Sequence, residues 1–139
     1  MIPNKVKLNP KKSVNGIVFG KKIDDYTDQF SFDISRSKPD DIPKWDTFTE
    51  NVSGIEVYVE DSIIVSIASR KTLYLDNVDL MSVPFSELRD VLKTEHTESD
   101  EIYLGEEDNP HNVYEFDSFG MQVWEKNNKI DCIICSDGE

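Results

Sequence analysis

Two stretches of this chain share one order of residue types, and this order restricts the fold more than any other feature. Residues 48–69 and 114–136 each begin with an aromatic residue six positions before a glycine. A large ring follows four positions after that glycine, and then come a polar turn and an apolar strand pattern. The glycines are Gly54 and Gly120, and the rings are Tyr58 and Trp124. Such similarity predicts one supersecondary unit used twice, with coincidence between two ordinary hairpins as the alternative.

Each stretch has the pattern of a β-hairpin. Apolar and polar residues alternate over 55–60 and 121–124, which is the period of a strand with one buried face. Polar residues at 60–62 and 126–129 supply the turns. When the strands that follow are aligned on their apolar runs, the second turn is predicted to contain one extra residue.

A short helix and a short strand are predicted ahead of each hairpin. Residues 86–93 follow Pro84, which suits a first helical turn, and their apolar residues share one face. A second helix is expected over 21–30, with Asp24, Asp25 and Asp28 on its outside. The predicted strands are 32–35 and 101–104, and a strand at 73–75 joins the halves.

Together these elements predict an α+β fold, an antiparallel β-sheet with a few short helices. The internal similarity predicts two tandem α-β-β-β-β half-repeats, at about 16–69 and 78–136. The chain of 139 residues fits one domain. We place this domain at 16–139 and a basic N-terminal arm at 1–15.

Charge is distributed unevenly along the chain. Residues 1–22 contain six lysines and no acidic residue, whereas the rest contains all 28 Asp and Glu against 9 Lys and Arg. The body therefore carries about −19, and the whole chain −13. Such a protein repels nucleic acid and anionic lipid and attracts basic surfaces, so we expect no nucleic-acid or membrane partner. A well-solvated acidic surface without a partner is the alternative.

The N-terminal sequence predicts a protein that stays in the cytoplasm. The lysine-rich start lacks the apolar segment of a secretory signal peptide, and no apolar run approaches the ~20 residues of a membrane helix. We expect a bacterial cytoplasmic protein.

The two cysteines, Cys132 and Cys135, have the spacing of a C-x-x-C motif but lie in an apolar run that reads as a strand. Residues three apart in a strand point to opposite faces, so we expect two reduced side chains and no metal or redox centre. Both histidines, His96 and His111, are expected to be exposed. No phosphate loop, nucleophile elbow or calcium-loop spacing is present in the sequence, so we predict no catalytic residue, metal or cofactor.

Two groups of residues are candidates for binding a partner. If the valines beside Tyr58 and Trp124 face the core, these two rings face outward among carboxylates, as aromatic anchors with a polar rim. A helix or the N-terminal segment covering them is the alternative. The second group is the acidic run of the second half. The predicted contact residues are Glu56, Tyr58, Glu60, Glu98, Asp100, Glu101, Glu106, Glu107, Asp108, Trp124 and Glu125.

The combination of short helix, paired strands and Gly-apolar-x-Val-aromatic hairpins in a small acidic chain resembles the immunity proteins of bacterial contact-dependent growth inhibition and related polymorphic-toxin systems. Residues 78–88 resemble the linker-to-helix step of two-repeat α+β domains of this kind. The resemblance covers roughly 16–136. It implies a protein that binds and neutralises the C-terminal domain of a cognate toxin, which is basic and often a nuclease. An acidic adaptor module with no toxin partner is the alternative function.

Overall fold

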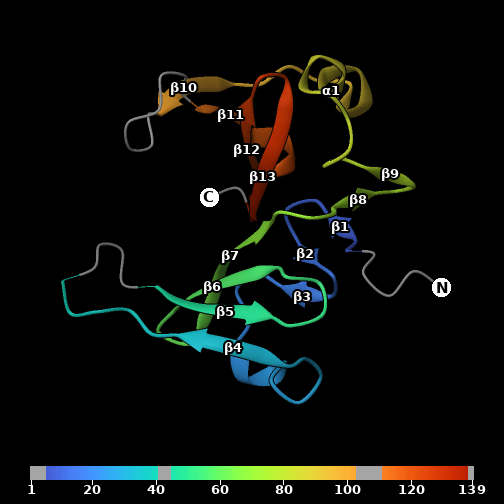
Figure 1. The fold of residues 1–139 in the computed structure, drawn as a ribbon. Helices are drawn as coiled ribbons and strands as arrows, with labels where there is room; N and C mark the ends of the chain where they lie inside the picture. The colour runs from blue at the N-terminus through green and yellow to red at the C-terminus, as the bar shows by residue number, and fades with distance from the viewer. Residues whose placement is uncertain (1–5, 41–44, 103–110, 138–139) are drawn as a thin grey trace.

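An antiparallel sheet of eight strands dominates the protein, which is 48% strand (Figure 1). The computed structural model describes residues 6–40, 45–102 and 111–137. The strand order across the sheet is β10-β11-β12-β13-β7-β6-β5-β4. In chain order these strands are β4 (Phe32–Ser35), β5 (Asp46–Glu50), β6 (Glu56–Glu60), β7 (Ile63–Ser69), β10 (Glu98–Ile102), β11 (His111–Phe116), β12 (Met121–Lys126) and β13 (Lys129–Ser136). The predicted antiparallel sheet is confirmed.

The sheet consists of two four-stranded meanders that meet where β7 pairs with β13. Every residue pairing between β5, β6 and β7 recurs between β11, β12 and β13. Corresponding residues are always separated by the same number of positions, which is the number that separates Tyr58 from Trp124. We call this separation the repeat offset. The pair Glu56↔Ala68, for example, recurs as Gln122↔Ile134. Ala68 and Ile134 are themselves paired across the junction, so the register is symmetrical about them.

The two hairpin turns have the same length, so the prediction of an extra residue in the second turn is wrong. Each hairpin carries a β-bulge at the corresponding position, next to Tyr58 and next to Trp124. Asp61 and Ser62 have φ of 50° and 68°, and Asn127 and Asn128 have 54° and 65°. Positive φ at both central residues is the conformation of a type I′ turn, which matches the twist of the strands.

One face of the sheet is covered by small elements that close the core. They are β1 (Leu8–Asn9), β2 (Ser13–Val14), β3 (Ile17–Val18), the 3-10 turn η1 (Ile23–Asp25), the hairpin β8 (Tyr74–Leu75) and β9 (Val78–Asp79), and α1 (Phe85–Leu92). Their apolar residues, such as Val14, Leu80 and Leu88, join one cluster with Val57 and Ile133 of the sheet. The 3-10 turn η2 (Asp117–Phe119) links β11 to β12. Residues 6–15, which the sequence assigned to an arm, form β1 and β2 and bury Val6 and Leu8.

The helix expected over 86–93 is present as α1, whereas the one expected over 21–30 is reduced to the 3-10 turn η1. The start of that segment is already used as a strand partner. The N–H of Gly20 donates to the Ile64 carbonyl, the N–H of Ile23 donates to the Ser62 carbonyl, and the N–H of Ile64 donates to the Lys21 carbonyl. The N-terminus of α1 is held by the second hairpin turn, where the N–H of Ser86 donates to the Asn128 side chain over 2.8 Å. The expected strand at 101–104 begins earlier, at Glu98, and residues 103–104 lie outside the described residues.

A buried carboxylate closes the loop between β5 and β6. Glu50 is 4% exposed and accepts hydrogen bonds from the N–H groups of Val52 and Ser53 and from the Ser53 hydroxyl, at 2.7–2.9 Å. Burial by itself would raise the pKa of Glu50, but these hydrogen bonds outweigh it and the pKa is lowered. The loop therefore depends on a charged Glu50.

We expect Glu50→Gln to lower the free energy of unfolding by ~1–3 kcal/mol at pH 7. The reason is that the glutamine N–H₂ group, a donor, would face the N–H groups of Val52 and Ser53, which are donors too. A carboxyl group whose pKa is lowered by folding stabilises the folded protein at pH values above its unfolded pKa. This stabilisation is lost as the pH falls through the folded pKa. The difference between wild type and variant should therefore shrink as the pH falls below about 5. Urea unfolding from pH 7 downward measures it. Glu87→Gln, at an exposed glutamate of α1, is the control and should change stability by less than ~0.5 kcal/mol. A difference that stays constant with pH would contradict the role of the charge.

Candidate functional site

The other face of the sheet carries the two large rings that the sequence pointed to. Tyr58 and Trp124 lie on the face opposite the core valines Val57 and Val123, as strand alternation predicts. The covering elements join the core on the valine side. We call the side with Tyr58 and Trp124 the open face.

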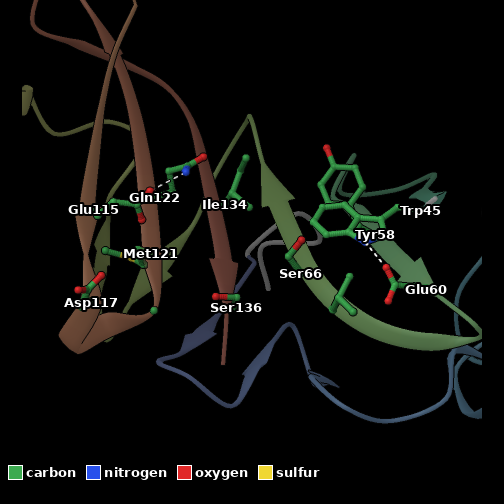
Figure 2. A pocket seen from close by; sticks show the side chains of 12 residues that line it. Trp45, Tyr58, Glu60, Ser66, Glu115, Asp117, Met121, Gln122, Ile134 and Ser136 are labelled. Atoms are coloured by element: carbon green, nitrogen blue, oxygen red, sulfur yellow. Dashed lines mark hydrogen bonds between the residues drawn. The ribbon is translucent and has the colours of Figure 1, made fainter. Parts of the chain in front are cut away.

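A groove of about 770 Å³ crosses the middle of the open face (Figure 2). Ser66 of β7 and Ile134 of β13 lie between its two walls, one from each meander. The lining residues belong to the sheet and its connections. They are Trp45, Tyr58, Glu60, Val65, Ser66, Glu115, Asp117, Gly120, Met121, Gln122, Ile134 and Ser136.

Two ring pairs stand on the open face, one in each meander. The rings of Trp45 and Tyr58 are 5.7 Å apart between centroids, and those of His111 and Trp124 are 6.1 Å apart. The repeat offset relates Trp45 to His111 as it relates Tyr58 to Trp124, so both pairs occupy corresponding register positions. The Trp45 indole N–H donates to Glu60 over 3.1 Å, which fixes the orientation of the ring.

The carboxylates of the open face differ in their interaction partners. Glu56 forms an ion pair with Arg70 at 2.8 Å. Glu60 and Glu115 form none with a described residue; they accept hydrogen bonds from Trp45 and from the Gln122 amide instead. Burial and then the Glu56 carboxylate raise the pKa of Tyr58, so its hydroxyl is neutral over the physiological range. The groove therefore has uncompensated negative charge on both walls.

The structure separates the predicted contact residues. Six of them lie on the open face by register: Glu56, Tyr58, Glu60, Glu98, Asp100 and Trp124. Glu101 follows Asp100 in an extended strand and so points to the other face. Glu106, Glu107 and Asp108 lie outside the described residues.

The prediction that Glu125 stands beside Trp124 on the same face is wrong. Glu125 is 7% exposed and points to the core side, because neighbouring residues of a strand face opposite ways. It accepts hydrogen bonds from the Asn112 side chain at 2.9 Å and from the N–H of Asn128 at 2.6 Å. Its role is to hold the second hairpin turn, which in turn caps α1.

Several groove residues were missed from the sequence, among them Trp45, Ser66, Glu115 and Ile134. The sequence contained one signal for Trp45, since Trp45 and His111 are separated by the same interval as Tyr58 and Trp124. The histidines are also less exposed than expected. The His111 side chain is 13% exposed and bonds to Asp131 at 2.9 Å, and His96 packs edge-on against Tyr114.

The two cysteines lie on opposite faces, as predicted from strand geometry. Cys132 is paired opposite Trp124 on the open face, and Cys135 belongs to the core. Both are buried and free. Among the described residues, no group of three or more His, Cys, Asp or Glu could hold a metal ion.

Comparisons with protein-family models, curated proteins and solved structures found no match for this chain. In the described parts of the chain, no helix has both the length and the apolar character that crossing a membrane requires.

We expect both thiols to be unreactive in the folded protein. Burial raises the pKa of Cys132, and burial followed by the nearby Cys132 raises the pKa of Cys135 to about 12. At pH 8, alkylation of Cys135 by iodoacetamide should be on the order of 100-fold slower or more in buffer than in urea, measured by mass spectrometry. Replacing both cysteines with alanine should cost about 1–2 kcal/mol through packing alone. Stoichiometric zinc, or a disulfide between the two, would contradict this.

Proposed function

We propose that this chain is a cytoplasmic immunity protein that binds the basic domain of a cognate toxin, of the nuclease class, and neutralises it. The observation that supports this most directly is the open face, which carries two ring pairs and uncompensated carboxylates and has a groove lined by one of these ring pairs. Large aromatic side chains within a polar rim are the composition of binding hot spots.

The charges of the open face favour a basic partner. Its exposed acids, Glu60, Glu98 and Asp100, have no ion-pairing partner among the described residues, and Arg70 is already paired with Glu56. With a net charge of −13, the chain attracts a basic domain over a Debye length of ~8–10 Å. Opposite fields raise association rates above the neutral ~10⁵–10⁶ M⁻¹s⁻¹.

A nuclease suits this face because its active site binds a polyanion. Such a site is a basic cleft, and carboxylates placed in it compete with the substrate phosphates for the same lysines and arginines. Inhibition then requires no chemistry by the inhibitor, in keeping with the proposal that this chain is not an enzyme.

We also propose that the two meanders are tandem half-repeats. The recurrence of pairings, bulges and turns at the repeat offset supports this. Two units of this size joined edge to edge provide one continuous face that is wider than either alone. The covering segment of the first half contains a 3-10 turn where the second contains α1, so the halves match best in their strands.

An adaptor that uses the same acidic face without a toxin is the competing function. The two functions differ in a simple way. A toxin inhibitor forms an equimolar complex with the product of the adjacent upstream reading frame and rescues cells that express it, whereas an adaptor does neither.

We expect the triple variant Glu98→Lys, Asp100→Lys, Glu115→Lys to lose protection of cells that express that upstream product. Its association rate with the toxin should fall by ~10-fold or more at low salt, and that of the wild type should fall as salt rises. Biolayer interferometry and a growth assay measure the two effects.

The matched control is Asp24→Lys, Asp25→Lys, Asp28→Lys. It makes the same change in net charge at exposed positions in and beside η1, in the layer over the other face. This control should keep most of the affinity and full protection. Equal loss in both variants would show that only total charge matters, and full protection by both with binding insensitive to salt would refute the proposed function.

A further inference from the structure

The groove combines three features that select a cation with a flat surface. The Trp45–Tyr58 ring pair lines one wall, and the carboxylates of Glu60 and Glu115 stand on opposite walls (Figure 2). Ring faces attract cations, most strongly when the ring is Trp. An anion would meet carboxylates on both sides, so the groove disfavours it.

A polar group inside the groove lacks a partner. Ser66 is 5% exposed and lines the groove, and its hydroxyl has no hydrogen-bond partner among the described residues. Buried hydroxyls are nearly always hydrogen-bonded, so this hydroxyl at the groove is available to accept a hydrogen bond from a ligand that enters it.

The other meander shows what fills the corresponding position. At the repeat offset, Ser136 in the groove corresponds to Arg70, and Gln122 corresponds to Glu56. In the first meander the Arg70 guanidinium bonds to Glu56 at 2.8 Å on the open face, beside Tyr58. In the groove the short side chain of Ser136 stands where that arginine would be, and Glu115 supplies a carboxylate that accepts a hydrogen bond from Gln122 at 2.7 Å.

We propose that the groove receives an arginine side chain of the basic partner, in the position that Arg70 occupies in the other meander. The guanidinium would donate to Glu115 and to the Ser66 hydroxyl, and the residues that flank the arginine would contact the Trp45–Tyr58 pair and Glu60 on the other wall. Arginine fits better than lysine because its guanidinium is flat, is weakly hydrated and presents five donors. The groove volume of about 770 Å³ is within the ~300–1,000 Å³ range of ligand pockets, enough for the arginine and its neighbouring backbone.

The source of the arginine rests on the proposed function, but the groove can be tested without a toxin. NMR titration of the full chain with a capped Gly-Arg-Gly peptide should shift the Trp124 indole N–H signal, because this N–H donates to Gln122, which in turn donates to Glu115. The same peptide with citrulline, the neutral isostere of arginine, should bind at least ~10-fold more weakly, because it lacks the charge that rings and carboxylates attract.

Two variants test the position of the guanidinium. Ser136→Arg supplies the side chain that Arg70 supplies in the other meander and should abolish the peptide-induced shift. Glu115→Gln should weaken peptide binding by ~3- to 10-fold, whereas Glu87→Gln, at an exposed glutamate of α1 in the layer over the other face, should leave it unchanged. Thermal unfolding of each variant confirms that it folds, and Glu115→Gln keeps the test valid if Ser136→Arg does not.

Equal shifts with the arginine and citrulline peptides, or an undiminished shift in Ser136→Arg, would overturn the arginine site. The outcomes also separate the two proposals. Loss of protection in the charge-reversal triple without any peptide binding would refute the arginine site and keep the immunity function. Peptide binding to the groove in a chain that never protects cells would keep the arginine site and refute the immunity function.

Discussion

The pairing of β7 with β13 is the interaction on which the rest of the molecule depends. It joins two four-stranded meanders into one sheet and removes two strand edges, which would otherwise expose unpaired N–H and C=O groups. Ile67 and Ile133, on the core side of this junction, have no exposed surface, and Ala68 is fully buried on the opposite side. The β7–β13 junction therefore lies at the centre of the core on one side of the sheet. On the other side it forms the middle of the open face, between the walls of the groove.

Because the register is symmetrical about Ala68 and Ile134, corresponding residues of the two meanders can be compared directly. Val59 corresponds to Glu125, and Glu125 is the buried acceptor that holds the second hairpin turn and, through it, α1. Arg70 corresponds to Ser136, and Ser136 lines the groove, whereas Arg70 forms an ion pair. A symmetrical scaffold thus carries an asymmetrical surface, and the asymmetry lies in a few side chains.

Local patterns predicted the hairpins and α1, since alternation, turn residues and the residue after Pro84 act within a few positions. The alignment of the two halves was mistaken by one residue because Ile63 corresponds to Lys129 and Ala68 corresponds to Ile134, so the apolar runs of the two strands begin and end at different register positions. The helix at 21–30 failed because backbone groups at 20–23 bond to the first hairpin. The groove could not be predicted from either half, since Trp45 and Glu115 come together only through the β7–β13 junction.

The junction also determines how charge is arranged in space. The lysines of the N-terminal segment, Lys7, Lys11, Lys12, Lys21 and Lys22, are exposed in the layer that covers the core side. The carboxylates of Glu60, Glu98 and Asp100 lie on the open face across the sheet. Acids of the covering layer, such as Asp24, Asp25 and Asp28, offset these lysines, so the open face is the more negative of the two sides and attracts a basic partner more strongly. Such a field orients the protein before contact, so an acidic chain of −13 gains from keeping its lysines together on the covered side.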